Sequence, residues 1–148
     1  MERFRHMIGT WRGPVTREPG WQGLFECSFT PYFEGAMIEV NARAVDPATG
    51  ESKTWGMGQV VLDTAGLVVW RSFHSNTGFS TMREVDDDPS VLALQGALAG
   101  DRRIVVCWKC SGDEMLLTFT TREESAAATE PQVVAHLRRV SLPLPERT

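Results

Sequence analysis

The stretch Ala36-Met37-Ile38-Glu39-Val40-Asn41-Ala42-Arg43-Ala44-Val45 alternates between apolar and polar side chains. Every even-numbered residue in it is apolar, whereas Glu39, Asn41 and Arg43 occupy odd positions. Because successive side chains of a strand point to opposite faces, this period of two predicts a β-strand with one buried and one solvated face. The next residues, Asp46-Pro47-Ala48-Thr49-Gly50, are typical of a tight turn, since Pro is second and Gly is last.

The rest of the chain shows the same pattern of short apolar runs separated by turn residues. We expect a short helical segment up to Met7, one domain over residues 1–148, and a frayed tail over residues 141–148. Short strands joined by tight turns predict an antiparallel all-β meander, closed as a barrel or packed as a sandwich. The ten expected strands are Ile8–Arg12, Leu24–Thr30, Ala36–Val45, Thr54–Leu62, Leu67–Phe73, Gly78–Val85, Val91–Leu98, Ile104–Lys109, Met115–Thr121 and Gln132–Val140.

Composition excludes several classes of protein. The 148 residues carry a net charge of −4 and no basic stripe, which argues against a nucleic-acid partner. No apolar run approaches the ~18 residues of a membrane span, and the first residues lack the apolar stretch of a signal peptide. We therefore expect a cytoplasmic protein without a membrane span. The oligomeric state stays open, with a homodimer among the alternatives.

The three cysteines do not indicate a disulfide framework, because their number is odd and a cytoplasmic compartment is reducing. Cys107-Trp108-Lys109-Cys110 has the C-x-x-C spacing of redox and zinc sites. Here it follows Ile104-Val105-Val106, so we expect it on a strand, where residues three apart point to opposite faces. We therefore expect two free thiols and no metal site. The sequence also contains no Gly-x-Ser-x-Gly elbow, P-loop or dinucleotide fingerprint.

The first expected strand begins Ile8-Gly9-Thr10-Trp11-Arg12-Gly13, and the last contains Arg138 and Arg139. A Gly-x-Trp in the first strand with an Arg in the last resembles the signature of calycin barrels, which include lipocalins, fatty-acid-binding proteins and bacterial lipocalin-like proteins. The resemblance implies a ten-stranded up-and-down barrel. It also implies that Trp11 plugs the closed end and that Arg138 or Arg139 packs over its face as a cation–π pair.

A narrower similarity to nitrobindins rests on Gly9–Gly13, Asp46–Glu51 and the late Glu130-Pro131…His136-Leu137. Nitrobindins are ten-stranded barrels that bind haem through a late His. The similarity implies His136 as the axial ligand and nitric oxide or peroxynitrite chemistry; the other interpretation is a surface or rim His. Because His136 precedes Arg138 by only two residues, about 7 Å of strand, we expect it near the barrel floor beside Trp11. We accordingly expect no cofactor and no native-like haem complex.

Aromatic residues and a few polar groups are the candidate ligand contacts. Trp70, Ser72 and His74 share one face of their strand, which suits an apolar pocket with convergent polar groups. The alternative is that the aromatic rings fill the barrel. An inward Arg43 could anchor an acidic ligand, as in fatty-acid-binding barrels, but its polar odd-numbered neighbours favour an outer face. The expected ligand-binding residues are Phe25, Phe29, Trp55, Met57, Trp70, Ser72, His74 and Trp108.

These observations favour one function over two alternatives. We expect binding or sensing of a small apolar or amphipathic molecule in a barrel cavity, with that molecule as the partner. The first alternative is the nitrobindin-like haem protein. The second is an enzyme that uses the dry cavity for cyclisation or isomerisation. Both a carrier and such an enzyme need an apolar cup with one or two polar groups, so catalytic residues are not assigned.

Overall fold

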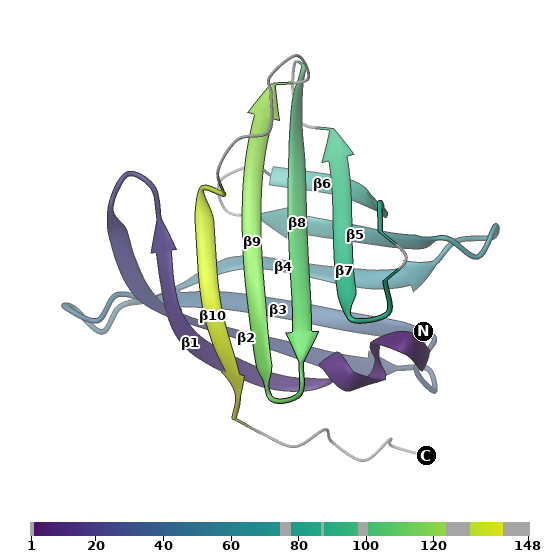
Figure 1. Cartoon of the computed structure of the whole chain (residues 1–148), viewed down its shortest axis with the longest axis horizontal. Helices are drawn as coiled ribbons and strands as arrows, with labels where there is room; N and C mark the ends of the chain where they lie inside the picture. Colours follow the sequence, from purple (N-terminus) through teal and green to yellow (C-terminus); the bar gives the residue numbers. More distant parts are fainter. Residues whose placement is uncertain (1, 75–77, 87, 98–100, 124–130, 141–148) are drawn as a thin grey trace.

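A computed structural model describes residues 2–74, 78–86, 88–97, 101–123 and 131–140. It shows one short 3₁₀ helix followed by ten strands (Figure 1). The expected tail over 141–148 lies outside the described residues. The elements are η1 (Glu2–Met7), β1 (Gly9–Arg17), β2 (Trp21–Tyr32), β3 (Met37–Val45), β4 (Ser52–Leu62), β5 (Val68–His74), β6 (Gly78–Glu84), β7 (Val91–Ala97), β8 (Arg102–Ser111), β9 (Glu114–Glu123) and β10 (Val133–Arg139).

Each strand pairs antiparallel with the next one along the chain, and β1 also pairs with β10. The sheet is therefore a closed ten-stranded barrel, which confirms the predicted fold class. The alternation in β3 is confirmed as well, because Ile38, Val40 and Ala44 are buried. On the outer face, Arg43 and Arg12 both form ion pairs with Glu26. The alternative of an inward, ligand-binding Arg43 is therefore wrong.

Two proline-containing stretches are strand rather than loop, contrary to the sequence prediction. β1 continues through Gly13-Pro14 to Arg17, and these two residues pair with β2 while leaving a gap in the register with β10. Pro14 has no N–H to donate, so the gap accommodates it. Gly13 is required there, because a Cβ would lie 1.8 Å from the His136 carbonyl oxygen. Pro31 is tolerated in β2 because the β1 register ends at Phe29, which leaves that edge unpaired.

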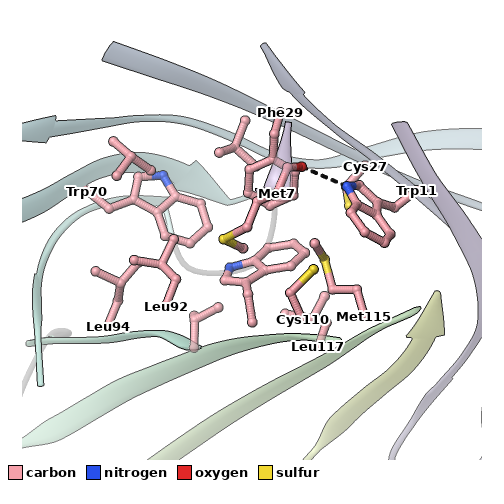
Figure 2. Close-up of a cluster of buried hydrophobic side chains, with 14 of the residues drawn as sticks. Met7, Trp11, Cys27, Phe29, Trp70, Leu92, Leu94, Cys110, Met115 and Leu117 are labelled. Atoms are coloured by element: carbon pink, nitrogen blue, oxygen red, sulfur yellow. Dashed lines mark hydrogen bonds between the residues drawn. The ribbon is translucent and has the colours of Figure 1, made fainter. Parts of the chain in front are cut away.

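One end of the barrel is filled by side chains and covered by η1. Phe4 and Met7 of η1 are buried, and the Trp11 Nε1 donates a 2.8 Å hydrogen bond to the Met7 carbonyl (Figure 2). The Arg139 guanidinium lies 4.1 Å from the Trp11 ring centroid. Arg138 is exposed instead and pairs with Glu114 at 3.4 Å. The plug is thus Trp11 with Arg139, and Arg138 is not part of it.

Arg139 also joins three segments that are distant in sequence. Its side chain is 11% exposed and donates hydrogen bonds of 2.6 Å to the carbonyl oxygens of His6 and Ile8. A third hydrogen bond, of 3.0 Å, reaches the Asp113 carboxylate in the β8–β9 turn. In Figure 1 this turn and η1 lie at the same end of the barrel. Arg139 therefore fastens η1 to the strand ends that surround it.

We predict that Arg139→Gln lowers the free energy of unfolding by about 2–4 kcal/mol, because it removes charged hydrogen bonds and a cation–π contact together. The neighbouring Arg138→Gln is the matched control, and we expect a change below about 0.5 kcal/mol for this exposed pair. Chemical denaturation followed by circular dichroism measures both. Equal stabilities of the two variants would contradict the role given to Arg139.

Candidate functional site

The end of the barrel opposite Trp11 contains a cavity of about 670 Å³. Its mouth is lined by residues at strand ends, among them Arg17 at the end of β1, Arg102 at the start of β8 and Gln132 beside β10. Its walls are lined by apolar and aromatic side chains. The wall residues are Phe25, Val40, Ala42, Trp55, Trp70, Val106, Trp108, Leu117, Phe119 and Val133, together with His74.

The aromatic rings of the wall contact one another in a continuous series. The Trp108 ring centroid lies 6.1 Å from that of Trp70 and 6.5 Å from that of Phe25. Phe25 in turn lies 5.3 Å from Trp55. His74 is 6.2 Å from Trp70 and its imidazole is 5.5 Å from the ring of Phe119. The rings are tilted relative to one another, as aromatic pairs in proteins favour, and together they line an apolar cup.

A β-bulge in β4 determines which aromatic residue enters the cup. Ala42 pairs with Gly56 and Arg43 pairs with Thr54, so Trp55 has no partner in the register. The inserted residue shifts the alternation of β4, and Trp55 then faces inward while Met57 faces outward. Met57 is 50% exposed on the outer wall, so its predicted place in the cavity is wrong.

Glycines in β4 make room for the side chains of β5. A Cβ on Gly58 would lie 1.7 Å from the Trp70 Nε1, and a Cβ on Gly56 would lie 2.9 Å from the His74 Nδ1. Only glycine at these two positions leaves the indole and the imidazole their present places against the wall. The sequence analysis did not single out this Gly-x-Gly pair.

Three buried nitrogen atoms of the cavity wall have no hydrogen-bond partner in the described part of the chain: Trp70 Nε1, Trp108 Nε1 and His74 Nε2. Most buried polar groups in proteins are paired, so an unpaired group needs an explanation. Indole nitrogens are donors only, whereas a neutral imidazole can donate or accept. The three atoms are shielded from solvent as well as unpaired, and they belong to side chains that line the cavity.

His74 has a lowered pKa because burial penalises its charged form. Its ordinary value of 6.5 already favours the neutral form at neutral pH, and burial strengthens that preference. The imidazole is consequently neutral at physiological pH. In this form Nε2 is able to serve as a hydrogen-bond acceptor or as a proton acceptor.

Of the eight residues expected to bind a ligand, five line the cavity: Phe25, Trp55, Trp70, His74 and Trp108. Phe29 and Ser72 are buried but do not line it. Phe29 packs edge-on against Trp108 at 5.2 Å, nearer the filled end, and the Ser72 hydroxyl is bonded to that of Ser80 at 3.0 Å. Both side chains thus contact neighbouring residues of the barrel instead of the cavity.

His136 is exposed on the outer face of β10, between the buried Ala135 and Leu137. The expected position beside Trp11 at the barrel floor is therefore wrong, because the alternation of β10 turns this side chain outward. The residue that the nitrobindin resemblance implied as a haem ligand does not reach the cavity. The residues present do not fit that mode of haem binding, and we derive no chemistry through haem.

The cysteines behave as buried apolar residues rather than as a reactive site. Cys27, Cys107 and Cys110 are free, and burial raises the pKa of each thiol above its ordinary value. Cys110 is buried on the inner face of β8, whereas Cys107 is only partly buried. Among the residues that the structure describes, no group of three or more His, Cys, Asp or Glu side chains could hold a metal ion.

The sequence-based prediction missed most of the lining residues, among them Phe119, Arg17 and Arg102. Phe119 follows Met115 and Leu117 at alternate positions of β9, so its inward direction could have been read from the period of two. Arg17 was missed because the expected first strand ended at Arg12 and the residues after it were predicted to be a loop. Arg102 precedes the expected start of its strand, and nothing in its local pattern indicates a cavity mouth.

Comparisons with known proteins support the fold. No protein-family model and no curated protein matches the sequence. The crystal structure of Rv2717c from M. tuberculosis superposes with a TM-score of 0.67 at 15% identity, covering 95% of this chain and 99% of that chain. The redesigned β-barrel mFAP1, bound to DFHBI, has a TM-score of 0.51 at 14% identity, covering 94% and 100%. A further redesigned barrel, b11L5F_LGL, has a TM-score of 0.52 at 15% identity, covering 92% and 93%.

At these identities the likeness shows a shared barrel fold and no more. Among the described residues, no helix is long and apolar enough to cross a membrane.

We predict that His74 makes the free energy of unfolding decrease as the pH is lowered. Since the folded protein holds the pKa of His74 below 6.5, the unfolded chain binds a proton first as the pH drops, and unfolding becomes easier. The unfolding midpoint of the parent should therefore drop more between about pH 8 and about pH 5 than that of His74→Gln. The exposed His136→Gln is the control. If the unfolding midpoint of His74→Gln falls as steeply with decreasing pH as that of the parent, the prediction is wrong.

Proposed function

We propose that this chain is a calycin-like carrier or sensor that binds a small apolar or amphipathic molecule in its barrel cavity. The observation that carries the proposal is the cavity of about 670 Å³ walled by aromatic rings. This volume lies within the roughly 300–1,000 Å³ that is usual for small-molecule sites. A cytoplasmic location is part of the proposal and is supported by the three free cysteines.

The chemistry of the wall supports binding of a partly polar guest. Phe25, Trp55, Trp70 and Trp108 offer apolar surface, whose burial contributes on the order of 25 cal/mol per Å² before the entropic cost of binding. His74, a polar side chain in this wall, would orient the guest. The redesigned barrels mFAP0 and mFAP1 were solved bound to DFHBI, which supports a ligand-binding role for a barrel of this shape.

A catalytic use of the same cavity is the second candidate, and one observation favours it. His74 lines the apolar cavity, and burial lowers its pKa and so favours the neutral imidazole. Such a group could accept a proton from a bound molecule during an isomerisation. A carrier releases its guest unchanged, whereas an isomerase releases a different isomer. Mass spectrometry and nuclear magnetic resonance of the recovered guest distinguish them.

Native mass spectrometry of freshly purified protein, together with its visible absorption spectrum, tests the proposal most directly. We expect a co-purified molecule of low mass that organic solvent extracts, and no Soret band. A sharp Soret band would replace the proposal with the haem alternative.

We predict that Ala42→Phe weakens binding of the neutral fluorescent probe N-phenyl-1-naphthylamine about tenfold or more, since the added ring occupies the cavity. Ala42 lines the cavity and is partly buried. The control Ala97→Phe adds the same ring at an exposed position on β7 and should bind like the parent. Fluorescence titration measures both, with circular dichroism to verify folding. Unchanged affinity in a folded Ala42→Phe would contradict binding inside the barrel.

A further inference from the structure

We propose that the molecule bound by the cavity is an organic anion, whose apolar body enters the aromatic cup while its anionic group remains at the mouth with Arg17 and Arg102. This inference deepens the proposed function and rests on it. It concerns the charge of the ligand, which the apolar wall alone does not determine.

The first observation is the pairing of the arginines in the described part of the chain. Away from the mouth, seven arginines have carboxylate partners: Arg3, Arg5, Arg12, Arg43, Arg83, Arg138 and Arg139. Arg17 and Arg102 line the cavity, and neither forms an ion pair or a side-chain hydrogen bond with the side chains that the structure describes; in the β8–β9 register Arg102 lies opposite Glu123. Arg17 has a single aromatic contact, 5.7 Å above the Trp21 ring. Arg71, on the outer wall, is similarly without a carboxylate partner but does not line the cavity.

The second observation is the balance of charge at the cavity. Among the described lining residues, Glu18 is the one carboxylate, against two guanidinium groups, and His74 is neutral because it is buried. Positive charges thus outnumber negative ones among these described lining residues, although the whole chain has a net charge of −4. An excess of one sign of charge at a cleft raises the local concentration of ligands of the opposite sign.

The third observation is the chemistry of the two guanidinium groups. Guanidinium groups bind the oxygen atoms of carboxylates and sulfonates through charge-assisted, often bidentate, hydrogen bonds. Arg17 and Arg102 at the mouth therefore favour an anionic group there, while the rings of Trp70 and Trp108 in the wall offer apolar surface to the body of the guest.

Two probes with the same skeleton separate charge from apolar burial. 1-Anilinonaphthalene-8-sulfonate carries a sulfonate, whereas N-phenyl-1-naphthylamine lacks it and is neutral. Fluorescence titration of each probe against the full chain gives a dissociation constant and a stoichiometry. We expect one site for each probe and about five- to tenfold tighter binding of the sulfonate, with the preference decreasing in high salt.

The variants assign that preference to particular side chains. The double variant Arg17→Gln/Arg102→Gln should lose the preference for the sulfonate while binding the neutral probe within about twofold of the parent. Glu18→Gln removes the opposing charge and should increase the preference. Arg71→Gln is the matched control, because it removes one exposed, unpaired arginine from the outer wall. It should leave both affinities unchanged.

The outcomes distinguish this inference from the proposed function. If the neutral probe binds at one site and the sulfonate binds no tighter, the inference is wrong and the proposed function stands. The inference is also wrong if Arg71→Gln reduces sulfonate binding as much as the double variant does. If neither probe binds the folded protein, the proposed function itself fails. Each variant is verified by circular dichroism, and Arg17→Gln and Arg102→Gln are measured singly if the double variant unfolds.

Discussion

The Arg139 guanidinium is the contact on which the organisation of the barrel depends. It lies on the Trp11 ring and holds the carbonyl oxygens of His6 and Ile8, so that η1 remains across one end of the barrel. Both buried side chains of η1 pack into that end. One end is filled and covered, and the cavity lies at the other end, where aromatic residues line it. The closed barrel thus has one end filled by side chains and one end that contains the cavity.

The strands contribute to both ends through a single inward face. In β8, alternate residues run from Val106 in the cavity wall, through Trp108, to Cys110 near the filled end. In β2, Phe25 lines the cavity while Phe29 packs behind Trp108. The floor of the cavity is therefore also the upper layer of the hydrophobic core. A change in that layer acts on stability and on binding together.

The sequence predicted the fold well because periodicity and turn chemistry are local. The alternation over Ala36–Val45 correctly indicated which side of that strand is buried. The direction of individual site residues was less predictable. Met57 was misplaced because the inserted Trp55 shifts the alternation of inward and outward side chains in β4. The local sequence contains no pattern that predicts this bulge. His136 was misplaced because its position was inferred from its two-residue spacing to Arg138 rather than from Val133, Ala135 and Leu137, the buried residues of its own strand.

The bulge at Trp55 makes the length of β4 as important as its composition. Deleting Trp55 itself would restore a regular ladder with β3, in which every other residue keeps its partner and its face, and the cup would lose one ring. A deletion elsewhere in the strand would instead shift the register by one residue and exchange the inner and outer faces on one side of it. In evolution, relatives that share this cup should therefore keep the count of residues between Arg43 and Gly58 even where the residues themselves diverge.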